Sequence, residues 1–252
     1  MKKRHLVYAI ALIVGMGACA ASAKKQAEAK PDVWKSYNVG TVLFEDKASE
    51  TKGSDIYHRI IPDAESYIKE QARTVLATLY NSPEDSITPV NKIHYTLEDI
   101  EGISAKGGGN GDVTIFYSTR HIEKSFAEND TAKLFFETRG VLLHELTHAY
   151  QLEPQGIGSY GTNRVFWAFI EGMADAVRVA NGGFDGPNAR PKGGNYMDGY
   201  RTAGYFFVWL RDNKDPEFLR KFNRSTLEVI PWSFDGAIKH ILGTEYRDRK
   251  ST

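Results

Sequence analysis

The chain has 252 residues, of which 41% are hydrophobic and 25% are charged, with 32 basic and 32 acidic side chains. This is the composition of a globular protein with a sizeable core, arranged as one large domain or as two closely packed lobes. Because no block of basic residues stands out, the composition disfavours nucleic acid as a partner.

The N-terminus has the pattern of an export signal. Lys2 to Arg4 are basic, an apolar run extends from Leu6 to Ala18, and Ala21-Ser22-Ala23 matches a cleavage site. We therefore expect a signal peptide at residues 1–23 and an exported protein, either secreted, periplasmic or anchored to a membrane as a lipoprotein. The alternative is a membrane-spanning helix, but this needs about 20 apolar residues, more than the run offers.

The only cysteine of the chain, Cys19, lies at the end of this apolar run. A bacterial lipoprotein signal places its lipidated cysteine there, so Cys19 either carries a membrane tether or is removed with the leader. In both cases the mature domain has no disulfide and no thiolate ligand for a metal. Without the three basic residues of the leader, 29 basic side chains face 32 acidic ones, a net charge of about −3.

The mature chain begins with a polar, alanine-rich segment, residues 24–38, which is expected to be a tether. Three strands are expected after it, because their residues are β-branched or aromatic, or alternate between polar and apolar. They are residues 39–44, 92–97 and 112–118. The glycine-rich segment at residues 107–111 is expected to be a flexible turn.

Helices are expected to dominate the rest of the chain. Apolar residues from Ile56 to Leu79 recur every three or four positions and predict one helix, with Pro62 near its start, where proline is tolerated. Later helices are expected at residues 131–152, 163–180, 197–211, 216–223 and 238–242.

Strands followed by helices indicate an α+β fold. We expect a single domain over residues 39–252. Its first part, residues 39–152, is expected to hold a small, mostly antiparallel sheet packed on the helix 131–152. Its second part, residues 153–252, is expected to be a helical lobe.

The helix expected at residues 131–152 contains His144-Glu145-Leu146-Thr147-His148. Two histidines four residues apart lie one turn apart on the same helix face, so both imidazoles can reach one metal ion. Glu145, beside the first histidine, can reach a water molecule on that ion and act as its general base. Two nitrogen ligands, a carboxylate that is not a ligand and an open coordination position are typical of zinc peptidases.

A catalytic zinc site needs a third protein ligand. In metzincins the motif continues with a glycine and a histidine, but this chain has Gln151 and Pro154 at those positions, which excludes that type. The other common type takes a glutamate from a later helix, as in thermolysin. Glu171 lies on such a helix, 23 residues after His148.

Asp175 follows Glu171 by four residues, so the two carboxylates share one helix face. We predict that Glu171 is the third ligand, and that Asp175 accepts the free N–H of a ligand histidine, most simply that of His144. The competing interpretation is an exposed pair of acids with Arg178, one turn on, as a salt-bridge partner. His94 and His121 have no ligand partner at helical spacing and are expected to lie outside the site.

Several segments carry a resemblance to a known family. They are residues 141–151 (VLLHELTHAYQ), 169–179 (FIEGMADAVRV) and 198–207 (DGYRTAGYFF), with a closing Leu242-Gly243. Over roughly residues 110–243 the chain resembles the basic secretory protein family, zinc peptidases of plants and bacteria with a thermolysin-like site. The chain differs from that family in not being basic, in a longer glycine-rich loop after the second segment, and in a short end.

The resemblance implies a zincin-like fold, one Zn²⁺ ion, and hydrolysis of peptide bonds in a peptide or protein substrate outside the cytoplasm. The expected reaction uses a zinc-activated water, with Glu145 first as base and then as proton donor to the leaving amine. Tyr200, inside a matching segment, is the candidate second donor to the oxyanion, unless it is only a packed aromatic. The strand at residues 112–118 is expected either at the rim of the site, where an edge strand would pair with an extended substrate, or as an ordinary strand of the sheet with no contact to the substrate.

Two other functions stay open from the sequence. One keeps the zinc chemistry and changes the substrate to a cell-wall polymer or a glycoprotein. The other is a non-catalytic surface-binding protein in which the zinc is structural. A structural zinc site is normally closed by four protein ligands, whereas the sequence offers three and a general base.

Overall fold

The computed structural model describes residues 32–125, 130–186 and 188–243. The expected leader with Cys19, and residues 24–31 of the expected tether, lie outside the described residues. Trp34 is buried against the core, so the packed part of the chain begins before residue 39. No helix within the described ranges is long and apolar enough to cross a membrane.

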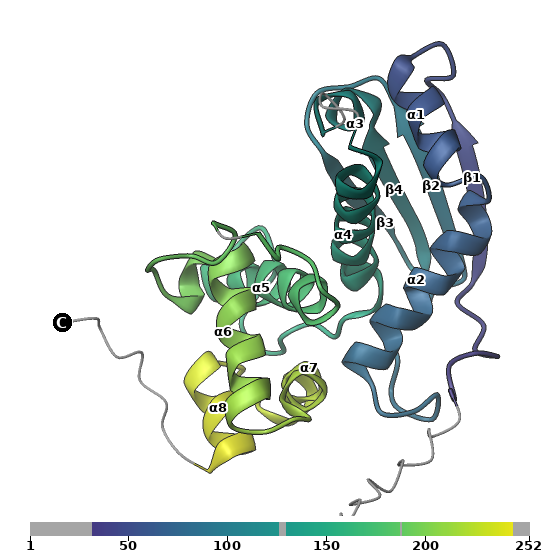
Figure 1. The fold of residues 1–252 in the computed structure, drawn as a ribbon. Helices are drawn as coiled ribbons and strands as arrows, with labels where there is room; N and C mark the ends of the chain where they lie inside the picture. Colours follow the sequence, from purple (N-terminus) through teal and green to yellow (C-terminus); the bar gives the residue numbers. More distant parts are fainter. Residues whose placement is uncertain (1–31, 126–129, 187, 244–252) are drawn as a thin grey trace, which may run out of the picture. The chain divides into compact units, whose positions relative to one another are not determined.

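Strands and helices follow one another in the order shown in Figure 1. The first part of the chain contains β1 (Thr41–Asp46), α1 (Lys52–Ile60), α2 (Ala64–Leu79), β2 (Lys92–Glu98), β3 (Ser104–Gly109), β4 (Asp112–Ser118), α3 (Thr119–Ser125) and α4 (Thr131–Tyr150). The second part contains α5 (Arg164–Ala180), the 3₁₀ turn η1 (Tyr196–Asp198), α6 (Tyr200–Asn213), α7 (Phe218–Glu228) and α8 (Phe234–Leu242). The expected α+β class is confirmed.

The four strands form one mixed sheet in the order β1-β2-β4-β3. The expectation of a mostly antiparallel sheet is wrong, because β1–β2 and β2–β4 are parallel and only β3–β4 is antiparallel. The physical reason lies in the connection between β1 and β2. It consists of α1 and α2, a helical crossover that returns the chain to the same end of the sheet and makes the next strand parallel.

The glycine-rich segment 107–111 is mostly strand, not a flexible turn. Gly107 to Gly109 pair with β4, and the turn itself is Asn110-Gly111. Both turn residues have positive φ, 54° and 82°, as a tight two-residue hairpin requires. As a result β3 is the edge strand, and β4, expected to be that edge, lies between β2 and β3.

The helix expected from Ile56 to Leu79 is two helices, because Pro62 breaks it. The residue before a proline is disfavoured in the helical region, and Ile61 has φ −131° and ψ 76°. Asp63 then caps α2 by accepting a hydrogen bond from the backbone N–H of Ser66.

One continuous cluster of buried apolar residues joins the sheet part to the helical lobe. Figure 1 shows α2 and α4 lying along the sheet, with α5 to α8 gathered in a second group of helices. In that group α5 is buried along nearly its whole length and packs between α4 and α6. The site lies where α4 and α5 meet.

Candidate metal centre

Helix α4 supplies the first half of the site. Its N-terminus is capped by Asp130, whose side chain accepts a hydrogen bond from the backbone N–H of Lys133. Leu142, Leu143 and Leu146 are buried and fix the rotation of the helix against the core. The two histidines of the motif therefore emerge where α4 faces α5.

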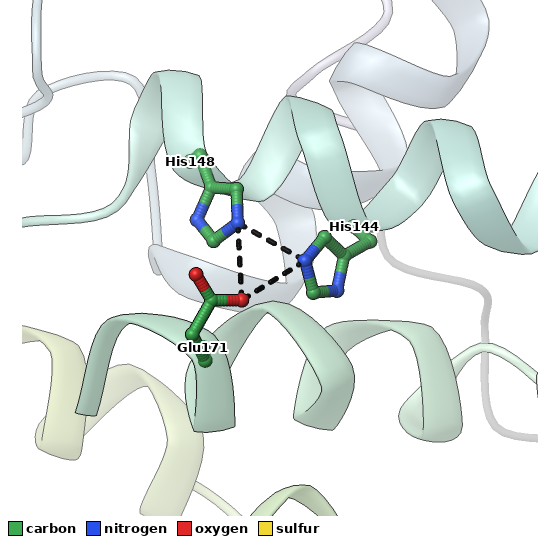
Figure 2. A group of neighbouring side chains, drawn as sticks. All are labelled: His144, His148 and Glu171. Carbon is green, nitrogen blue, oxygen red and sulfur yellow. Dashed lines mark hydrogen bonds and ion pairs between the residues drawn. The ribbon is translucent and has the colours of Figure 1, made fainter. Parts of the chain in front are cut away.

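Three side chains converge there, as Figure 2 shows. His144 and His148 come from α4, and Glu171 comes from α5. The Nε2 atoms of the two histidines are 3.0 Å apart, and Glu171 Oε2 lies 3.3 Å from the first and 3.6 Å from the second. Within the part of the chain that the structure describes, this is the one group of three or more His, Cys, Asp or Glu side chains that could hold a metal ion.

The geometry of the three donor atoms fits a zinc ion. With bonds of about 2.0–2.1 Å in tetrahedral coordination, neighbouring donors lie about 3.3 Å apart, which is the size of this triangle. Two imidazoles and one carboxylate are also a donor set that zinc takes in catalytic sites. The other side chain of the motif, Glu145, does not belong to the triangle but lines the same cleft.

Asp175 lies one turn beyond Glu171 on α5. Its Oδ1 is 2.7 Å from Nδ1 of His144, the ring nitrogen that points away from the triangle. With Nδ1–H donating to this carboxylate, Nε2 of His144 keeps its lone pair for a metal. Both carboxylates of α5 are buried, so they are not the exposed pair of the competing interpretation. Arg178 pairs with Glu137 of α4 instead.

The charges of His144 and Glu171 depend on each other and on their neighbours. Burial alone lowers the pKa of His144, but hydrogen bonds with Asp175 and Glu171 and the charge of Glu145 raise it to about 10. Burial opposes ionisation of Glu171, yet hydrogen bonds with both histidines and with Tyr160 hold its pKa well below the ordinary value. Without metal, a proton therefore sits on His144 beside an ionised Glu171, and a metal must displace that proton.

His148 has its own partner in Gln151, the residue that begins the loop after α4. The side-chain amide of Gln151 lies 2.9 Å from Nδ1 of His148, and its Oε1 is buried without a hydrogen-bond partner. A metal on Nε2 would place the proton of His148 on Nδ1, and the amide would then present its oxygen to the ring. Nδ1–H of His148 then donates to Oε1, which leaves Nε2 free as a ligand. The contact between Gln151 and His148 was not predicted from the sequence, because Gln151 was considered there only as a residue that excludes the metzincin pattern.

Two tyrosines flank the triangle. The hydroxyl of Tyr160, in the loop between α4 and α5, donates to Glu171 Oε1 at 2.5 Å. The ring of Tyr200 stacks on His144 with centroids 6.1 Å apart and meets Trp167 edge-on. Burial and the carboxylates of Glu171 and Asp175 raise the pKa of Tyr200, so its hydroxyl stays a donor at neutral pH.

The backbone at Tyr200 is strained. Its φ is +40°, a backbone conformation that residues other than glycine rarely adopt. It follows Gly199, whose φ is +68°. Gly199 packs so closely on Trp167 that a Cβ there would lie 2.6 Å from the indole ring. Strain of this kind is found at functional sites, where the surrounding structure holds it in place.

One open cleft of about 890 Å³ is lined by the three side chains of the triangle, together with Glu145, Gln151, Tyr160, Asp175 and Tyr200. One wall comes from β3, through residues 104–106, and the floor comes from α4 and α5. Ser104 and Lys106 lie opposite Tyr117 and Ile115 of β4, whose side chains are buried under the helices, so all four share the covered sheet face. The edge strand β3 therefore runs beside His144, His148 and Glu171, the candidate metal-binding group.

A family model described as "Peptidase of plants and bacteria" matches residues 39–249. The chain belongs to this family, the basic secretory protein family. No curated protein and no solved structure matches the chain. Membership in a peptidase family implies a peptide or protein substrate.

In this member of the basic secretory protein family, the structure brings together the residues predicted for the site. The two histidines, Glu171 and Asp175 are in contact, and Tyr200 lies over them. His94 and His121 lie apart from the group, as expected, and pair with Glu45 and Glu137. Tyr160 was missed, because a tyrosine in a glycine-rich loop carries no periodic signal that points to Glu171.

Proposed function

We propose that this protein is an exported, zinc-dependent peptidase that hydrolyses peptide bonds in the cleft between α4, α5 and β3. The observation that supports this most strongly is the triangle formed by His144, His148 and Glu171 at the base of an open cleft. Three protein ligands leave one coordination position for water or substrate, as in catalytic rather than structural zinc sites.

In this proposal Nε2 of both histidines and Oε2 of Glu171 would hold the ion. When bound, zinc lowers the pKa of a water molecule toward neutrality and polarises the scissile carbonyl. Asp175 and Gln151 keep the two imidazoles in the tautomer that presents Nε2.

Glu145 is the proposed general base. It is 6% exposed, adjoins His144 on α4 and lines the cleft beside the triangle. Its carboxylate would take a proton from the attacking water and pass it to the nitrogen of the leaving amine. Since a carboxamide can do neither, Glu145→Gln removes this function while preserving the shape of the side chain.

The proposal is tested by zinc content and by cleavage of a mixed peptide library, for wild type and Glu145→Gln. We expect full zinc content in both and a loss of about 10²–10⁴ in the cleavage rate of the variant. Glu153→Gln, which alters another acid of the same cleft, is the matched control and should cleave normally. Zinc in all three proteins without any cleavage would contradict the peptidase proposal and favour a surface-binding protein with a structural zinc.

Tyr200 is the proposed donor to the oxyanion that develops on the scissile carbonyl. Tyr200 lines the cleft, and its ring packs against His144 and Trp167. Tyr200→Phe should lower kcat by roughly 10²-fold with unchanged zinc content, because one such donor is worth about that much. Unchanged kcat would remove Tyr200 from the mechanism and leave Tyr160 as the hydroxyl to test.

The edge strand β3 is the proposed support for the substrate backbone, in place of the strand expected at residues 112–118. Its outer edge has no strand partner among the described residues, and residues 104–106 line the cleft. An extended peptide could add there as a fifth strand and lie across the metal-binding group.

We further propose that the chain is exported by its leader, because residues 1–23 have the pattern of a signal peptide. Mass spectrometry of the mature N-terminus tests this directly. A chain beginning at Lys24 indicates ordinary cleavage, and a lipid-modified chain beginning at Cys19 indicates a membrane tether. An unprocessed N-terminus would contradict export by this route.

A further inference from the structure

The stripe of site residues on α5 continues beyond the metal-binding group. Glu171, Asp175 and Arg178 are spaced by four and three residues, so they lie on one face of the helix. Arg178 lies about 10 Å along the helix from Glu171, a length that two or three residues of extended peptide span. All three line the cleft.

Arg178 is a guanidinium held rigidly in the cleft wall. It is 6% exposed, Nη2 donates to Glu137 Oε2 at 2.6 Å, and its Cζ lies 3.8 Å from the ring centroid of Phe184. Nε is buried without a partner, packed against Gly140, where a Cβ would lie 2.4 Å from it. Nη1 makes no hydrogen bond to the residues that the structure describes and is not among the fully buried unpaired atoms.

Arg201 of α6 brings a second guanidinium to the same place. Its Cζ lies 5.4 Å from the ring centroid of Phe184, and it lines the cleft with Arg178. Phe184 is held between these two cations in a strained conformation, with φ +55°, and its carbonyl accepts a hydrogen bond from the hydroxyl of Tyr205. Arg201 is exposed and forms no ion pair with any described residue.

The charges at this end of the cleft do not balance. Glu137 offsets one positive charge, and it is itself shared with His121 at 3.2 Å. Arg201 forms no ion pair with any described residue, and neither does Lys106 of β3, which lines the same cleft. Among the described residues that line the cleft, those beyond the C-terminus of α4 and near the N-terminus of α5 are Glu153, Tyr160, Phe166 and Ile170, and none of them is a cation. Electrostatics therefore distinguish the two directions in which a peptide leaves the metal-binding group.

We propose that the Arg178–Phe184–Arg201 end of the cleft is a subsite for a carboxylate of the substrate, an inference that rests on the proposed peptidase function. Guanidinium groups bind carboxylates through paired, charge-assisted hydrogen bonds, and here Nη1 of Arg178 and the fork of Arg201 are available for them. The carboxylate belongs to an Asp or Glu side chain within three residues of the scissile bond, or to the C-terminus of a short peptide.

The test compares peptides in matched pairs. One set carries Glu or Gln at each of three positions on either side of the scissile bond, and the other ends in a free acid or an amide. We expect the full-length, zinc-loaded protein to prefer the charged member of at least one pair by roughly tenfold in kcat/KM, as for a charge-assisted hydrogen bond. A preference for Glu over Gln indicates that the carboxylate is a side chain, and a preference for the free acid over the amide indicates that it is the C-terminus.

Variants assign that preference to the subsite. Arg201→Gln should reduce the ratio to near one, and Arg201→Glu should invert it, with the larger change in the kcat/KM of the charged peptides. Arg211→Gln, on the same helix but outside this cleft, is the matched control and should keep the ratio. Arg201 is exposed, so these changes leave the folding of the chain intact, which the buried Arg178 does not guarantee.

A binding measurement keeps the subsite testable apart from catalysis. Fluorescence anisotropy of the same labelled peptides on the full-length Glu145→Gln protein should show the same preference for the charged member, lost in Glu145→Gln/Arg201→Gln. If the wild type cleaves nothing, the proposed function fails, yet this preference still supports the subsite. Equal binding of charged and uncharged members, or a preference that survives Arg201→Gln, overturns it.

Discussion

The two helices of the metal-binding group contribute to it in different ways. On α4, His144, Glu145 and His148 lie within five consecutive residues, so helical geometry alone brings the two imidazoles together. On α5, Glu171 reaches them only because that helix lies at the right depth and rotation against α4. On its other side, close packing at glycines holds α5 against α6. A Cβ at Gly172 would meet Ala203 of α6 at 2.6 Å, and one at Gly204 would meet the backbone of α5 at 2.8 Å.

Half of this site is therefore a local motif, and the other half is a tertiary contact. Substitutions on α4 should act on ligands or proton transfer directly. Substitutions on α5 should in addition report how firmly the two helices are held together.

Glu171→Gln should have the largest effect on metal binding. The amide keeps the size of the side chain but loses the charge that neutralises the site, and zinc retains only two imidazole ligands. We expect zinc to be lost on dialysis against a weak chelator, with cleavage lost in parallel, as measured by metal analysis. Glu153→Gln is the control, since it changes a carboxylate of the same cleft that touches no ligand. Retained zinc in Glu171→Gln would show that the α5 half is dispensable.

Asp175→Asn should weaken metal binding without removing a ligand. The asparagine oxygen can still accept the hydrogen bond from Nδ1 of His144, but the negative charge that raises the basicity of the ring is gone. Loss of such a partner typically costs 10–100-fold in metal affinity, which competition with a chromophoric chelator measures. An affinity equal to that of wild type would mean that orientation, not charge, is what Asp175 provides.

The pH dependence gives a second measurement on the same pair. In the metal-free protein the pKa of His144 is raised to about 10, so protons compete with zinc and its apparent affinity should fall as the pH falls. A raised pKa also stabilises the metal-free fold below the ordinary histidine value of about 6.5, and this stability is lost as the pH rises through about 10. The Tm of the metal-free protein should therefore decrease as the pH rises from about 6.5 to about 10, and the decrease should be smaller in Asp175→Asn. A metal-free Tm that rises over this range would contradict the charge assignment.

These contrasts also explain which parts of the molecule were predictable from sequence. The α4 half followed from one pattern, and Glu171 with Asp175 followed from their spacing once a third ligand was required. Gln151 and Tyr160 did not, because both act through contacts across loops that no periodicity encodes. The edge strand β3 was not predicted for a related reason. Its glycines are typical of a turn, and only their pairing with β4 shows that they form a strand. Local motifs were thus predictable, whereas the partners that orient them depend on tertiary structure.

The smallest expected effect comes from a residue that contacts no ligand. Gly172→Ala places a methyl group 2.6 Å from Cβ of Ala203 and 2.8 Å from Cε2 of Phe207, both fully buried and unable to move freely. Overpacking of this kind costs about 1–3 kcal/mol, and the better helix propensity of alanine returns about 1 kcal/mol, so we expect a net loss of up to about 2 kcal/mol. Gly161→Ala is the control, because its Cβ meets nothing within 4 Å.

Urea unfolding of the metal-free protein measures the stability, and chelator competition measures the zinc affinity. If α5 is positioned by this packing, both should fall together in Gly172→Ala and neither in Gly161→Ala. A loss of stability with unchanged zinc affinity would instead show that α5 keeps its position against α4 independently of α6.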